Sequence, residues 1–502
     1  QLGVVMALSE ADARDVARGL LDVRAKECRR LDEIRRYVRG EVIRVFRPRR
    51  HTRDYTELVD MARTNIIPLV VSTFAENLAV TGFKPAKAPQ MSPAWDRDWQ
   101  ANRMDARQSA LWRTAIEYGL SYASVLPGRM DDQRLGLISL WSPRQCTAVY
   151  DDPIGDEWPV YFITVRKGWD ARRRKYVQRV TLTDEELLYH FIRSGDSEDT
   201  LVLDEEREGG PVQAHGLEIG PGMAPLVRFA AAGGDLDDQA RGEVEPLMPY
   251  QDALNQTTFT LRTVERAQGW RQRWAAGIEI QEDEHGNPIE PFSGGADKVW
   301  ISNSPNTKFG EFGEADPSGL LESRQSTMRI ITAVAQMAPH SLLVTDGIAN
   351  LSSDALAALE AAQQRKIAEY KTSFGESVEQ LLRLTSLAAD DMDGWRDRSS
   401  QVIWRDTESR SLGQVADALG KLAQMLGIPR RAMWRMAIEL LPWLSQQDLE
   451  AWEREADRED GLLEQQMERE LEQITRQTQL EPEGGAQDGN ARRRPARAGA
   501  PA

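Results

Sequence analysis

Gly242-Glu243-Val244-Glu245-Pro246-Leu247-Met248-Pro249-Tyr250-Gln251-Asp252-Ala253-Leu254-Asn255 begins a long amphipathic pattern in the middle of the chain. A short apolar run, Pro225 to Phe229, precedes it and reads as a strand. From Glu243 to Trp274 apolar side chains recur at helical spacing, which predicts one helix with the stripe Leu247, Tyr250, Leu254, Leu261 and Val264. At 1.5 Å per residue this helix is about 50 Å long, and its stripe needs a neighbour to cover it.

Two further helices follow. Asp316 is predicted to cap the second helix, with Pro317 at its first position. The apolar residues of this helix are Leu320, Leu321, Met328, Ile331 and Val334. The longest helix runs from Ser352 or Ser353 to about Ala389, with the stripe Leu356, Leu359, Ile367, Tyr370, Phe374, Val378 and Leu381. Amphipathic helices of this length, joined by short inserts, do not close a core alone, so we expect each copy to require neighbours.

The remaining segments predict an α+β fold that is mainly helical. Alternating apolar and polar residues with frequent turns indicate a β-rich module between residues 120 and 230. Helices are predicted at Ser9–Gly40, Tyr55–Leu78 with a break near Pro68, Trp95–Tyr118, and in the C-terminal region after Leu412. Residues 277–313 break the helical pattern, with a turn at Asp283–Pro288 and a short strand at Lys298–Ile301.

Composition excludes several classes of protein. The 502-residue chain carries 63 Lys and Arg against 79 Asp and Glu, a net charge of −16, which argues against tight gripping of nucleic acid but permits DNA to slide past. No apolar run approaches the roughly 20 residues of a membrane span. Cys28 and Cys146 are expected to be reduced, and neither they nor the five scattered histidines have the spacing of a metal site. Phosphate-loop, nucleophile-elbow and zinc-protease motifs are absent from the sequence. We therefore expect no catalytic residue, no cofactor and no metal ion.

Two patterns admit a functional and a structural interpretation. The basic segment Arg44 to Arg53 suits an anion or nucleic-acid contact, but a solvated linker or charged subunit interface is the favoured explanation. Trp270 and Trp274, at i and i+4 on the predicted helix, suit stacking on bases. Packing against a neighbouring helix or subunit is favoured here too.

The order of several short motifs resembles that of the portal proteins of tailed double-stranded DNA phages, in particular siphophages of actinobacteria. The resemblance covers roughly residues 20–475. Its motifs are Tyr55-Thr56-Glu57-Leu58, Asn65 to Val71, Val80-Thr81-Gly82-Phe83, Ala115 to Tyr122, Ser142-Pro143 with Val149-Tyr150-Asp151, Asp252-Ala253-Leu254-Asn255, and Asn350 to Leu356. The chain departs from the family at Ala230-Ala231-Ala232-Gly233 and Arg241-Gly242-Glu243, where relatives often have a polar Asn and Gly-x-Ser.

The resemblance implies a portal architecture of named regions. Residues 1–240 would form the wing, 241–276 and 316–338 the two stem helices, and 277–315 the clip. Residues 339–351 would form the tunnel loop, 352–390 a long wing helix, 391–480 the helices of the crown, and 481–502 a disordered basic tail.

The resemblance also implies a function. The chain would form a ring, a dodecamer, at one capsid vertex, assembled in the host cytoplasm and retained in the virion, through which double-stranded DNA is packaged and ejected. Its partners would be other copies of itself, the DNA, the large terminase, the major capsid protein, scaffold and a head-tail adaptor, with no membrane. The tunnel-loop residues facing DNA would be Ser341, Leu342, Leu343, Val344, Thr345 and Asp346; contacts of the clip with terminase or adaptor would be Glu284, His285, Asn287 and Trp300.

Two alternatives stay open at this point. The chain could be another head-tail connector or capsid-vertex assembly protein, although adaptors are usually much shorter. It could also be a nuclease with a dispersed site such as Asp235, Asp237 and Asp238. For the tunnel loop itself, an ordinary helix-helix connection is the alternative.

Overall fold

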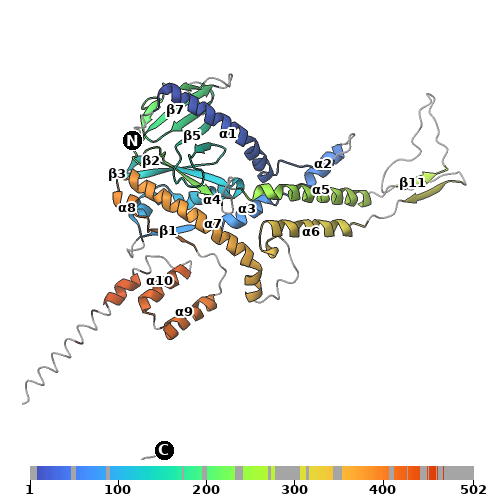
Figure 1. Cartoon of the computed structure of the whole chain (residues 1–502). Helices are drawn as coiled ribbons and strands as arrows, with labels where there is room; N and C mark the ends of the chain where they lie inside the picture. The colour runs from blue at the N-terminus through green and yellow to red at the C-terminus, as the bar shows by residue number, and fades with distance from the viewer. Residues whose placement is uncertain are drawn as a thin grey trace, which may run out of the picture. The chain divides into compact units, whose positions relative to one another are not determined.

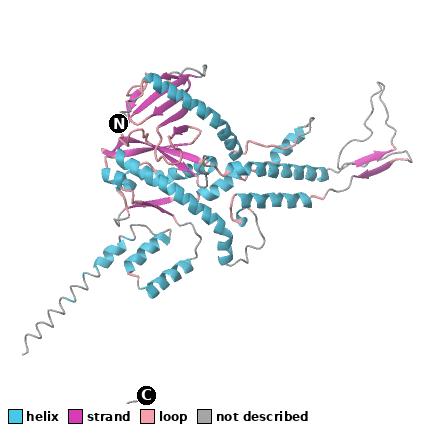
Figure 2. Ribbon diagram, in the orientation of Figure 1, coloured by secondary structure: helices cyan, strands magenta, loops and turns pink. Residues whose placement is uncertain are grey.

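The structure of the 502-residue chain is a computed structural model (Figures 1 and 2). It describes residues 8–46, 53–85, 91–171, 174–194, 201–231, 241–269, 273–277, 306–311, 316–342, 353–405, 412–426, 428–440, 449, 451–458, 461 and 467. The chain divides into two compact units, Gln1–Arg405 and Asp406–Ala502. Helices and strands are mixed in the first unit, and the described part of the second is helical.

The first unit contains four stacked layers. Helix α7 (Ser353–Ala388) packs on one face of a three-stranded antiparallel sheet ordered β10-β2-β3, made of Leu226–Ala230, Leu120–Met130 and Gln133–Trp141. The other face of that sheet meets the larger sheet through a small core that includes Tyr122, Trp141 and Phe162. Helix α1 (Glu10–Val38) covers the far side of the larger sheet, as Figure 1 also shows.

The larger sheet has six antiparallel strands in the order β4-β5-β6-β7-β8, with β9 also paired to β7. Their bounds are Cys146–Val149, Tyr161–Asp170, Lys175–Thr183, Leu187–Ser194, Leu201–Leu203 and Val212–Ala214. Ala13, Ala17 and Leu20 of α1 pack on its apolar residues, among them Ile163 and Val180. Because side chains alternate along a strand, the same strands serve both this core and the core shared with the smaller sheet.

The main core lies where α7 meets α3 (Ile67–Ala75), α4 (Met104–Tyr118) and the three-stranded sheet. Trp112 is fully buried there and its ring stacks on Phe374 at 5.2 Å between centroids, with Phe229 and Trp404 also in contact. A two-stranded sheet joins β1 (Val80–Lys84) to β13 (Gln401–Trp404). This pairing joins the last strand of the first unit to the strand that follows α3.

Two helices and a hairpin follow the β-rich region. Helix α5 (Val244–Gly269) lies side by side with α6 (Ser318–Val334) in Figure 1, and they contact each other. Strands β11 (Arg273–Ala276) and β12 (Lys308–Glu311) pair in antiparallel register. Shorter elements are α2 (Arg53–Met61), the π-helix η1 (Trp95–Trp99), the 3₁₀ turn η2 (Pro339–Ser341) and α8 (Met392–Arg396). The second unit contains α9 (Leu412–Leu426) and α10 (Arg430–Leu440).

Most predicted elements are present. Ser9 caps α1 by accepting the Asp12 backbone N–H at 3.2 Å, and residues 120–230 form the expected β-rich module. The break near Pro68 separates α2 from α3, with Pro68 in the first turn of α3. The longest helix, α7, begins and ends within one residue of its expected bounds. Residues 391–405, predicted to belong to the helices of the crown, contain both helix α8 and strand β13 within the first unit.

One predicted helix is wrong because tertiary hydrogen bonds override its local pattern. Residues 95–118 do not form a single helix: η1 ends at Trp99, and Arg103 takes a left-handed φ of 54° before α4. Buried Asp98 accepts the Gly136 backbone N–H at 3.0 Å, and Asn102 bonds Gly136 O and Ile138 N at 2.7 and 2.8 Å. The turn is therefore bonded to β3 as well as to η1.

The end of the central helix is also corrected. Helix α5 ends at Gly269, so Trp274 lies in strand β11, opposite Gly310 of β12. Trp270 is outside the described residues. The two tryptophans therefore do not share one face of a helix, and the stacking platform that this spacing suggested is not formed in that way.

Replacing Trp112 by Ala tests the main core. The change removes a fully buried ring from the junction of α4, α7, β10 and β13, so we expect the free energy of unfolding to fall by about 3–5 kcal/mol. Chemical denaturation followed by circular dichroism measures it. Met130→Ala, on the exposed tip of β2, is the matched control and should change stability little.

Candidate functional site

The start of α5 is fixed against the end of α4. A Cβ on Gly242 would lie 2.2 Å from the carbonyl oxygen of Glu117, so only glycine allows this approach. The next residue, Glu243, donates its backbone N–H to Ile116 O at 2.8 Å. The direction in which α5 leaves the core is therefore set by backbone contact.

The side chain of Glu243 joins three helices at this point. Its carboxylate lies 2.6 Å from Lys366 Nζ and accepts a hydrogen bond from the Tyr370 hydroxyl, both on α7. Lys366 also donates to the carbonyl of Ala335, directly after α6, at 3.2 Å. The Lys366 and Glu243 side chains are only 14% and 15% exposed, and burial together with Glu243 raises the pKa of Tyr370. The carboxylate of Glu243 thus connects the start of α5 with α7 and, through Lys366, with the residue after α6.

Sequence reasoning missed this cluster, although a signal was present. Lys366 and Tyr370 are four residues apart on α7 and so share one face with its apolar stripe. A lysine beside a buried stripe requires an anionic partner. Only the fold identifies that partner as Glu243.

Polar side chains of α5 hold the link between α2 and α3. Gln251 accepts from Ile66 N at 3.1 Å and donates to Thr64 O at 2.6 Å, and Asn255 Oδ1 accepts from Thr64 N at 3.3 Å. One turn away, the Tyr37 hydroxyl of α1 donates to Asp252 at 2.7 Å. Asp252 and Asn255 of the motif Asp252-Ala253-Leu254-Asn255, together with Gln251, therefore help to attach α5 to α1 and to the α2–α3 link.

Helix α6 has a covered face and an open face. Ile331 and Ala335 are buried in the main core with Leu247 and Leu254 of α5. On the opposite side Ile330, Ala333 and Val334 are exposed, Ile330 by 43% and Val334 by 37%. We call these three residues the open α6 face. Adjacent exposed apolar side chains on a helix are typical of a surface that another chain covers.

The predicted tunnel loop is only partly described. Ser341 and Leu342 are half-buried; Ser341 ends the turn η2, and Leu342 packs against the main core. Ala338 N donates to Gln363 of α7 at 2.9 Å, which anchors the start of the loop. Leu343, Val344, Thr345 and Asp346 lie outside the described residues, so the DNA contact of this loop stays a prediction.

The predicted clip contacts Glu284, His285, Asn287 and Trp300 lie outside the described residues, as do Asp235, Asp237 and Asp238. The described part of this region is the β11–β12 pair. Trp274 is packed over Gly310, since a Cβ there would lie 2.5 Å from its ring. Trp274 and Phe309 are 39% and 43% exposed, so the hairpin presents aromatic surface.

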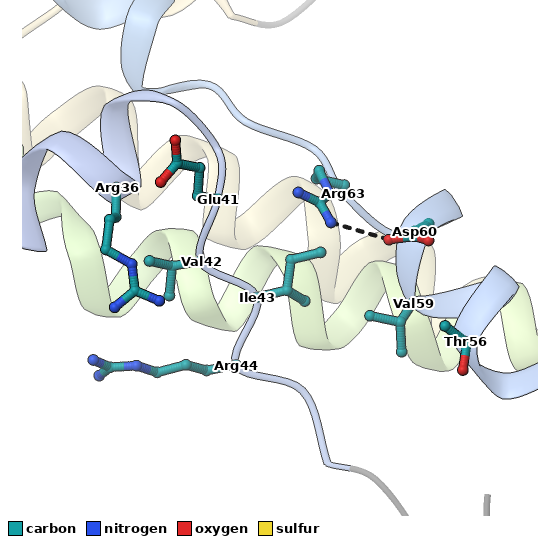
Figure 3. Close-up of a pocket in the computed structure, with 9 residues that line it drawn as sticks. All are labelled: Arg36, Glu41, Val42, Ile43, Arg44, Thr56, Val59, Asp60 and Arg63. Carbon is teal, nitrogen blue, oxygen red and sulfur yellow. Dashed lines mark hydrogen bonds and ion pairs between the residues drawn. The ribbon is translucent and has the colours of Figure 1, made fainter. Parts of the chain in front are cut away.

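Figure 3 shows a pocket of about 290 Å³ between the end of α1 and helix α2. Three arginines line it, Arg36, Arg44 and Arg63, with Glu41 and Asp60 among the other residues. Arg63 donates to Gly40 O at 2.8 Å and to Asp60 at 3.0 Å, and Arg44 donates to Glu33 at 2.6 Å. Two of the three guanidinium groups are thus bonded within the chain. Of the predicted basic segment only residues 44–46 and Arg53 are described, and Arg44 forms an ion pair with Glu33 of the same chain.

The described residues contain no group of three or more His, Cys, Asp or Glu side chains that could hold a metal ion. Burial raises the pKa of the Cys146 thiol well above its usual range, which makes it a poor nucleophile. Burial lowers the pKa of His190 to about 4, so it is neutral at pH 7, and His190 Nδ1 lies 3.0 Å from Thr181 Oγ1. Within the described part of the chain, no helix is both long and apolar enough to cross a membrane.

The described fold pairs α5 with α6, places the β11–β12 strands between them in the sequence, and leaves apolar residues of α6 exposed. A model of the family described as phage portal protein, SPP1 Gp6-like, matches residues 19–462. The chain belongs to this family of phage portal proteins. It is a structural component of the virion and not an enzyme.

Individual relatives agree with the family. The portal protein of Mycobacterium phage D29 is 23% identical over 367 residues, 70% of this chain and 71% of that protein. The portal protein of Mycobacterium phage L5 is 21% identical over 365 residues, with the same coverage. Among solved structures, a chain from the virion of a native gene transfer agent particle gives a TM-score of 0.39 at 14% identity, covering 78% of this chain and 94% of that one. A chain from the neck of an empty particle, computed with C6 symmetry, gives 0.36 at 14% identity, covering 79% and 96%.

Gly242→Ala tests the junction between α4 and α5. The added methyl group meets the Glu117 carbonyl at 2.2 Å, so the free energy of unfolding should fall by about 1–3 kcal/mol. Gly319→Ala is the control, because nothing lies within 4 Å of a Cβ placed there. Thermal unfolding of both variants makes the comparison, and equal melting temperatures would refute the packing argument.

Glu117 gives a pH-dependent prediction at the same junction. Burial raises its pKa from 4.5 to about 7. Because the folded state favours the protonated carboxyl, this contribution to stability is complete below pH 4.5 and is lost as pH rises through 7. Glu117→Gln should therefore melt at a higher temperature than the unchanged protein at pH 8 and at nearly the same temperature at pH 4.5. An equal difference in melting temperature between the two proteins at both pH values would contradict the raised pKa of Glu117.

Proposed function

We propose that copies of this chain form a ring, a dodecamer, at one capsid vertex, and that double-stranded DNA passes through it during packaging and ejection. Membership of the portal family supports this function. The observation that carries it is the open α6 face, where Ile330, Ala333 and Val334 are exposed on a helix whose other side is already buried.

In the proposed ring the open α6 face contacts a different surface of a neighbouring copy. The α5–α6 pair buries one face of each helix, which leaves the open α6 face available for this contact. A contact between two unlike surfaces repeats from copy to copy and closes into a ring when the rotation allows it. Each copy would then form one segment of the ring.

Within this ring the regions are assigned as follows. Residues 1–240 and 352–390 form the wing, α5 and α6 the stem, residues 277–315 the clip, and residues 339–351 the tunnel loop. We place the crown after Arg405 rather than from residue 391, because β13 pairs with β1 of the wing.

The loop Ser341-Leu342-Leu343-Val344-Thr345-Asp346 is proposed to face the DNA. It contains no Lys or Arg, and the chain has a net charge of −16, so it provides few strong attractions to phosphates. A moving duplex then meets no deep electrostatic minimum. The clip, including Glu284, His285, Asn287 and Trp300, is proposed to dock the large terminase during packaging and the head-tail adaptor afterwards. The wing and crown would contact the major capsid protein and scaffold.

Negative-stain microscopy and native mass spectrometry test the ring. The unchanged chain should give rings with a stain-filled hole and the mass of twelve copies. Ile330→Asp with Val334→Asp places two charges on the open α6 face, so we expect rings to be replaced by monomers and small oligomers. Met130→Asp, at the exposed tip of β2, is the control and should keep the rings.

Two outcomes would count against this proposal. Compact monomers of the unchanged chain at every concentration tested would exclude the ring. Intact rings in the double variant would show that α6 does not form the subunit contact.

A further inference from the structure

The tip of the β5–β6 hairpin carries two exposed aromatic rings. Trp169 of β5 lies directly opposite Tyr176 of β6 in the ladder. The rings meet edge to face at 5.3 Å between centroids, and the two residues are 57% and 73% exposed. Aromatic rings this exposed do not serve the core of the described unit, so the pair is available to another molecule.

The same hairpin concentrates positive charge in an acidic chain. Residues 166–179 contain seven Arg and Lys residues and a single acidic one, Asp170, in a protein with a net charge of −16. Asp170 is buried and forms an ion pair with Arg179 at 2.8 Å, which offsets its negative charge. Lys167 and Arg174 are exposed.

The ladder places Lys167, Trp169 and Tyr176 on one face, and Arg174 lies in the turn directly before β6. Alternate residues of a strand share a face, so Lys167 and Trp169 lie on the side of β5 that carries Ile163 and Val165. Helix α1 covers Ile163 and Val165, whereas Lys167 and Trp169 are exposed beyond it. Across the ladder, Lys167 pairs with Gln178 and Gln178 with Arg193. We call Lys167, Trp169, Arg174 and Tyr176 the hairpin face.

We propose that the hairpin face binds nucleic acid without sequence preference. Lys167 and Arg174 contact phosphates, and Trp169 and Tyr176 stack on bases or pack on sugars. An acidic protein partner would use the cations but has no need for two flat exposed rings. Because bases stack only where they are unpaired, single-stranded DNA binds more tightly than a duplex. The inference goes beyond the proposed conduit, since it concerns the wing rather than the stem or the tunnel loop.

Fluorescence anisotropy with the full-length protein tests this inference. The ligands are a labelled single strand of about 30 nucleotides and the corresponding duplex, each measured over a range of salt concentrations. Trp169→Ala and Tyr176→Ala should each weaken single-strand binding about tenfold, because stacking is lost, with a smaller effect on the duplex. Lys167→Glu with Arg174→Glu should weaken both ligands and reduce the slope of log affinity against log salt by about 2.

Arg129→Glu is the matched control, an exposed charge reversal on the neighbouring β2–β3 hairpin. It should leave both affinities within about twofold. Circular dichroism of each variant identifies any that has unfolded, and polyglutamate serves as a competitor. Unchanged affinities in the folded hairpin variants, or displacement of DNA by polyglutamate at equal charge concentration, would overturn the proposal. Negative-stain microscopy of the same samples tests the ring separately. If rings form but nucleic-acid binding does not depend on the hairpin face, this inference is refuted and the proposed ring is not.

Discussion

The carboxylate of Glu243 is the contact on which the arrangement of the long helices depends. It lies directly before α5 and contacts Lys366 and Tyr370 on α7, while Lys366 bonds the backbone directly after α6. An ion pair this buried carries a large desolvation cost, and loss of either partner would leave an uncompensated charge. The directions of α5 and α6 are therefore tied to α7 by one polar cluster, which the close approach of Gly242 to Glu117 reinforces.

This attachment explains how a chain with an incomplete core remains ordered. The first half of α5 packs on α1, α3 and α4, and its Gln251 and Asn255 side chains form hydrogen bonds with the backbone between α2 and α3. The second half of α5 contacts α2 through Phe259 as well as α6, whereas apolar side chains of α6 remain exposed. In a single copy the first half of α5 is thus anchored, whereas one face of α6 is uncovered.

Charge is distributed unevenly over the described surface, and this separates two kinds of contact. The open α6 face is apolar and suits a further copy of the chain. The hairpin face is cationic and aromatic, in a protein with a net charge of −16, and suits a polyanion. The arginines of the pocket in Figure 3 differ from both, because Arg44 and Arg63 are bonded to groups of the same chain.

The sequence by itself determined the elements whose pattern is local. The 3.6-residue stripes predicted α1, α5, α6 and α7, and the alternating run predicted the β-rich module, because these periodicities reflect a single buried face. Only the tertiary structure decided the conformation of segments in which the local pattern competes with contacts to residues that are distant in sequence. Asp98 and Asn102 bond β3 and divide the helix expected at 95–118, and pairing with β12 places Trp274 in a strand. The β1–β13 pair and the Glu243, Lys366 and Tyr370 cluster join residues more than a hundred positions apart. No periodicity encodes such contacts, because they depend on how the completed elements pack.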